Sequence, residues 1–106
     1  MGADGISTAM LSKQKVVAGQ ATMLDLMLDR TDGSAPNITP YLGAFAHVIA
    51  VPSDGDSLIH VHPMSGTKPN EGMLHMTLPA KGLYRFWIQF MDNGQVKTVP
   101  IVVRAR

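Results

Sequence analysis

The histidines are the residues whose type and spacing point most directly to chemistry. Three of the four lie between His47 and His62, and a single valine separates His60 from His62. Alternate side chains of a β-strand share a face, so a strand over residues 57–62 directs both imidazoles to one side. An antiparallel hairpin that turns near Asp54 brings His47 beside the pair.

Converging imidazoles are ligands for Cu(II), Zn(II) and Ni(II). The spacing therefore predicts a metal site formed by His47, His60 and His62. His75 is a candidate fourth ligand, because it follows on a later alternating segment that also carries Met73. The alternative for any single histidine is a solvent-facing position on a sheet with no ligand role.

Methionine is the second signal, with eight in 106 residues. Thioethers are soft ligands that favour Cu(I), so Met64 and Met73, which are close in sequence to histidines, are candidate ligands that favour copper over zinc. Methionine also fills gaps in protein cores. We interpret Met23, Met27 and Met76 as strand packing of that kind.

Composition excludes several other functions. The net charge is +1 with no basic run, which argues against a nucleic-acid partner, and the absence of cysteine removes thiolate chemistry and disulfides. No apolar run is long enough for a membrane-spanning helix. No Gly-x-Ser-x-Gly, phosphate-loop or His-Glu-x-x-His pattern is present. We predict no catalytic residues and no organic cofactor.

The elements that position these residues read as short strands. Residues 21–29 alternate, with leucines on one face, and residues 83–91 alternate with aromatic and aliphatic side chains on one face. Asn93-Gly94 is a strong hairpin signal. We predict an all-β, immunoglobulin-like antiparallel sandwich of about seven strands over residues 13–106. Residues 1–12 show no strand period and are predicted to be a flexible arm.

Several of these segments resemble a family of small bacterial exported domains, the YtkA-like group. The resemblance is carried by Tyr41-Leu42-Gly43-Ala44, His47, His60-Val61-His62-Pro63 and the segment from Gly82 to Phe90. It covers about residues 13–103, with Ala46 where the pattern leads us to expect glycine. The resemblance implies an immunoglobulin-like or cupredoxin-like sandwich. It also implies that the protein is periplasmic or secreted. It also implies metal handling, with copper as the leading metal and His47, His60 and His62 as ligands.

Three hypotheses follow. The first is an exported copper-binding module that captures or transfers the ion, from or to another metal-handling protein. The second is a mononuclear copper or zinc enzyme, for which the sequence supplies no acid or base. The third is a metal-free interaction domain whose histidines form only a polar patch. Under each hypothesis, an exposed sheet edge could pair with a second copy of the chain to form a homodimer.

Overall fold

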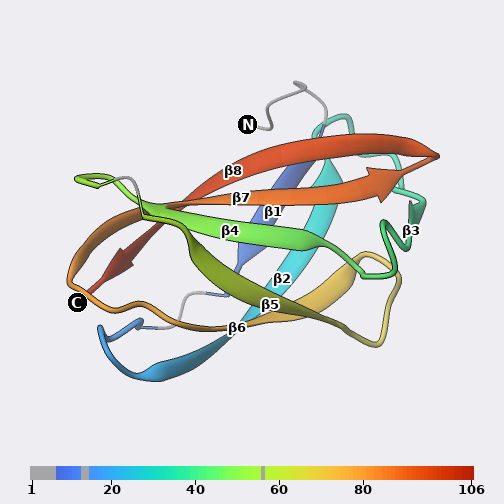
Figure 1. Ribbon diagram of the computed structural model, residues 1–106. Coiled ribbons are helices and arrows are strands. Elements are labelled where there is room, and N and C mark those ends of the chain that lie inside the picture. Colours follow the sequence, from blue (N-terminus) through green and yellow to red (C-terminus); the bar gives the residue numbers. More distant parts are fainter. Residues whose placement is uncertain (1–6, 13–14, 56) are drawn as a thin grey trace.

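Residues 7–12, 15–55 and 57–106 are described by a computed structural model (Figure 1). Within them the chain forms eight β-strands and no helix, so no helix is long and apolar enough to cross a membrane. The strands are β1 (Ser7–Leu11), β2 (Ala21–Arg30), β3 (Ile38–Thr39), β4 (His47–Pro52), β5 (Ile59–Ser65), β6 (Glu71–Thr77), β7 (Gly82–Asp92) and β8 (Gln95–Ala105).

The strands follow the order β1-β2-β6-β5-β4-β7-β3, and β8 pairs along the whole length of β7 on its other edge. Every strand pair is antiparallel. The change of layer occurs at β5, which pairs with β4 up to Val61 and with β6 from His62 onward. Figure 1 shows β1 and β2 crossing behind β4 and β7. The architecture is the antiparallel β-sandwich that the sequence predicts.

The core lies between the two layers, and strand alternation explains its composition. Leu24, Leu26 and Leu28 point inward from β2, as predicted, and each is at most 1% exposed. Four alternate residues of β7 are also buried: Tyr84, Phe86, Ile88 and Phe90. Because successive side chains of a strand point to opposite faces, the residues between them must face outward. The outer faces therefore carry the side chains available for binding.

Local features fix both ends of β7, and the Asn93-Gly94 hairpin signal is confirmed. Asn93 and Gly94 have positive φ angles of 54° and 76°, as the tight turn between β7 and β8 requires. At the other end, the Tyr84 hydroxyl donates a hydrogen bond to the Ala80 carbonyl (2.6 Å) and accepts one from the Ala80 N–H (3.1 Å). This is the tyrosine-corner arrangement known from immunoglobulin-like sandwiches. It fixes how the chain enters β7.

The amino-terminal prediction needs correction. Residues 7–11, expected to belong to a flexible arm, form β1, which pairs with β2 along its whole length from Ser7↔Arg30 to Leu11↔Leu26. Ser7 is fully buried. The sandwich therefore begins before residue 13. Residues 1–6 of the predicted arm lie outside the described residues.

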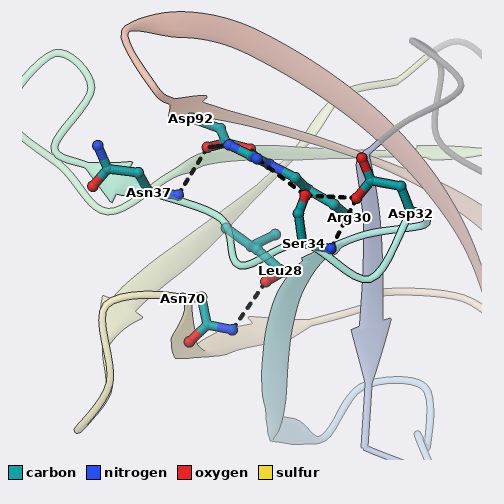
Figure 2. Close-up of polar contacts among 7 residues, drawn as sticks. All are labelled: Leu28, Arg30, Asp32, Ser34, Asn37, Asn70 and Asp92. Carbon is teal, nitrogen blue, oxygen red and sulfur yellow. Dashed lines mark hydrogen bonds and ion pairs between the residues drawn. The ribbon is translucent and has the colours of Figure 1, made fainter.

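One ion pair ties the far ends of β2 and β7 together (Figure 2). The Arg30 guanidinium donates through Nε and Nη2 to both oxygens of Asp92, at 2.9 and 2.8 Å, and the Asn37 N–H donates to the same carboxylate at 2.9 Å. Asp92 is only 3% exposed. These bonds, the Arg30 guanidinium first, hold the pKa of Asp92 below its ordinary value against the opposing effect of burial.

Candidate metal site on the outer face of the sheet

His60 and His62 lie on the outer face of β5, as their spacing predicts. Both side chains are exposed, whereas Val61 between them is fully buried. The two rings are tilted by 51°, and their centroids are 5.1 Å apart. Zn–N bonds are about 2.0–2.1 Å long, so rings at this spacing need only rotate about their side-chain bonds to share an ion.

His75 faces the same pair from the neighbouring strand. It lies directly opposite His62 in the β5–β6 ladder, and it is exposed. Side chains directly opposite each other in an antiparallel pair have Cβ atoms about 4.5–5.5 Å apart. His60, His62 and His75 are therefore neighbours on one surface, although they come from two strands. We call these three residues the histidine cluster.

Two predicted methionine ligands form the next row of the same face. Met64 lies opposite Met73 in the β5–β6 ladder, one outward position along from His62 and His75. Met64 is 38% exposed and Met73 is half-buried. The register thus places thioethers beside imidazoles without bringing either into the core.

His47 is placed differently. Extending the β4–β5 ladder by one pair would set it opposite His62, but β5 leaves β4 after Val61. Its Nε2 lies 2.8 Å from the Tyr41 carbonyl oxygen, and its ring packs edge-on against the Tyr41 ring with centroids 5.4 Å apart. A carbonyl only accepts, so this bond assigns the ring hydrogen to Nε2 and leaves the lone pair on Nδ1. A backbone carbonyl commonly orients a metal-binding histidine in this way.

The imidazoles are neighbours rather than a closed chelate. Within residues 7–12, 15–55 and 57–106, no three His, Cys, Asp or Glu side chains converge closely enough to hold a metal. The full convergence of His47, His60 and His62 that the sequence led us to expect is therefore not assembled. A site on this face requires ring rotation and a thioether or water as a further ligand.

The packing interpretation of two methionines is wrong. Met23 is 43% and Met27 is 37% exposed on the outer face of β2, whereas Met76 is in the core as expected. Met23 lies opposite His75 in the β2–β6 ladder, so the row Met23, His75, His62 crosses three strands. The signal was present in the sequence, because residues that alternate with buried leucines must point outward.

The chain belongs to a family described as a domain of unknown function (DUF8832), whose model matches residues 2–106. No curated protein matches the sequence.

Proposed function

We propose that this member of the DUF8832 family is a metal-binding module that captures a copper ion on the outer face of β5 and β6. His60, His62 and His75 supply imidazole ligands, and Met64 or Met73 completes the coordination. The observation that carries the proposal is the arrangement of the histidine cluster, with ring centroids of His60 and His62 5.1 Å apart and His75 directly opposite His62.

Copper is favoured over zinc by the thioethers in the next row. Imidazole accepts either metal, but methionine sulfur is a soft ligand that suits Cu(I). A mixed imidazole and thioether surface can therefore hold copper in either oxidation state. Zinc is the alternative ion if only the imidazoles bind.

Exposure of the ligands supports capture and transfer rather than catalysis. All three clustered histidines are on the solvent side of a rigid sheet, where another metal-handling protein can reach the ion. A catalytic centre also needs a positioned acid or base, and we assign none. The proposal includes a periplasmic or secreted location, which the resemblance to exported YtkA-like domains supports.

A titration of metal-stripped protein with Cu(II), Cu(I) under reducing conditions, and Zn(II) tests the proposal. We expect one-to-one copper binding that His60→Ala/His62→Ala weakens by at least about 100-fold, because mutating even a residue that only hydrogen-bonds to a metal ligand costs about 10–100-fold in affinity. Thr77→Ala is the matched control, since Thr77 is exposed on the same strand two residues from His75. Affinity that survives in the double variant would refute the proposal.

His47→Ala separates the two versions of the site. If His47 only anchors the segment at Tyr41, through its 2.8 Å contact, the variant keeps most of its copper affinity. If Nδ1 of His47 is a ligand after rearrangement, His47→Ala loses affinity as His62→Ala does. Both outcomes retain the histidine cluster as the centre of the site.

A metal-free interaction domain is the second candidate, and one surface favours it. A depression of about 470 Å³ on the outer face of the other layer is lined by Leu83, Arg85, Trp87 and Val102. Val102 is 58% exposed, and the Arg85 guanidinium lies 5.7 Å from the centre of the Trp87 ring. Exposed aromatic and arginine side chains are enriched where proteins bind one another.

A further inference from the structure

A methionine groove crosses the outer face of β1, β2 and β6. Met10, Met27 and Met73 line a depression of about 480 Å³, and Asp25 and Glu71 line it with them. We call these three methionines the methionine groove. Neither Met10 nor Met27 belongs to the copper site proposed above.

Strand register brings the three thioethers together. Met10 lies opposite Met27 in the β1–β2 ladder, and Met27 lies opposite Glu71 in the β2–β6 ladder. Met73 is therefore diagonal to Met27. Directly opposite Cβ atoms are about 4.5–5.5 Å apart, and diagonal neighbours at about 7–8 Å remain within reach of long side chains. Three flexible methionines can thus direct their sulfur atoms to one point above β2.

Packing does not account for Met10 and Met27. Met10 is 59% and Met27 is 37% exposed, and the inward positions of β2 are already filled by leucines. The groove offers a bound ion soft sulfur atoms, with negative charge beside them from Asp25 and Glu71. Thioethers select Cu(I) among the biological metals, and nearby carboxylates favour a cation by direct Coulomb attraction.

We infer that the methionine groove is a second ion site, specific for a soft monovalent cation such as Cu(I). Met73 is also a candidate ligand of the copper site proposed above, whereas Met10 and Met27 lie away from the histidine cluster. Met27 lies four residues along β2 from Met23, which pairs with His75, a displacement of about 13 Å at the rise of an extended strand. The inference goes beyond the proposed function and does not depend on it, because in the ladders Met27 lies opposite Met10 and Glu71 and not opposite a histidine.

The test uses the full chain with ¹³C-labelled methionine methyl groups, titrated with Ag(I) as a redox-inert soft cation and then with Cu(I) under anaerobic reduction. We expect the methyl signals of Met10, Met27 and Met73 to shift together and saturate at a one-to-one ratio. The signal of Met76, which is in the core, should stay in place. Zn(II), a harder ion, should leave the groove signals unchanged.

Met10→Leu/Met27→Leu removes two sulfurs while conserving side-chain volume, and Met91→Leu, in β7 of the other layer, is the control. We expect the double variant to lose at least about tenfold in Ag(I) affinity at the groove. His60→Ala/His62→Ala should keep that affinity, so failure of the histidine site and failure of the groove give different results. Methyl signals that never saturate, or a double variant that binds Ag(I) normally, would overturn the inference. A change in oligomeric state without loss of Ag(I) affinity would overturn it too, and would identify the groove as a contact between copies.

Discussion

Gly72→Ala is expected to destabilise the sandwich by about 3 kcal/mol, the upper end of what overpacking usually costs. Gly72 is buried in β6, where the chain passes very close to its neighbours. A Cβ added there would overlap the Met64 carbonyl oxygen and come within 2.7 Å of Cε2 of the Phe45 ring. A backbone carbonyl cannot move aside as a flexible side chain does, so the strands must separate.

Chemical denaturation of the variant measures this effect, and Gly55→Ala is the matched control. A Cβ at Gly55 meets nothing closer than 3.8 Å, so its substitution should be close to neutral. Gly72 also lies in the β5–β6 ladder opposite Ser65, next to the Met64↔Met73 pair. Gly72→Ala should therefore lower the copper affinity as well as the stability. An unchanged midpoint for Gly72→Ala would show that β5 and β6 are not packed as closely as described.

Asp92→Asn is expected to cost about 2 kcal/mol at neutral pH, the range for hydrogen bonds to charged groups. The carboxylate accepts two bonds from Arg30 and one from the Asn37 N–H. An amide has only one oxygen to offer. The ends of β2 and β7 would then lose the charged hydrogen bonds that join them.

The same carboxylate makes stability depend on pH. The pKa of Asp92 is lower in the folded chain than in the unfolded chain, first because of Arg30. Its contribution is therefore complete above the unfolded value of about 3.9 and is lost as the pH falls through the lower folded value. When the free energy of unfolding is measured from pH 7 to pH 2, it should decrease as the pH falls through that acidic range.

In Asp92→Asn the acidic slope should be shallower but still present, because the pKa of Asp32 is also lowered, mainly by the Ser34 hydroxyl. Asp54→Asn, at an exposed turn, is the control and should follow the parent. Parallel curves for Asp92→Asn and the parent chain would contradict the assignment of the acidic slope to this ion pair.

Much of the fold is readable from local patterns. The leucines of β2 and the alternating Tyr84, Phe86, Ile88 and Phe90 of β7 are predicted correctly because burial on one face imposes a period of two. The same pattern does not predict β1. Its inward positions include Ser7 and Ala9, whose small side chains leave little hydrophobic contrast. The two residues of β3 are too few to show any period.

The candidate site is only partly readable. The shared face of His60 and His62 follows from local spacing, but the pairing of His62 with His75 depends on the order β2-β6-β5, which no local pattern encodes. The hairpin between β4 and β5 is predicted correctly, yet the change of partner after Val61 separates His47 from the pair. Long-range register decides both results.

Adding substoichiometric Cu(II) to ¹⁵N-labelled protein and recording which NMR signals are lost tests the copper site on β5 and β6 most directly. Paramagnetic broadening reports which nuclei are nearest the ion. We expect the imidazole and amide signals of His60, His62 and His75 to disappear first. Signals of β8, three strands from β5 in the ladder, should persist. Broadening that begins elsewhere, or spreads evenly over the surface, would contradict a copper site on this face.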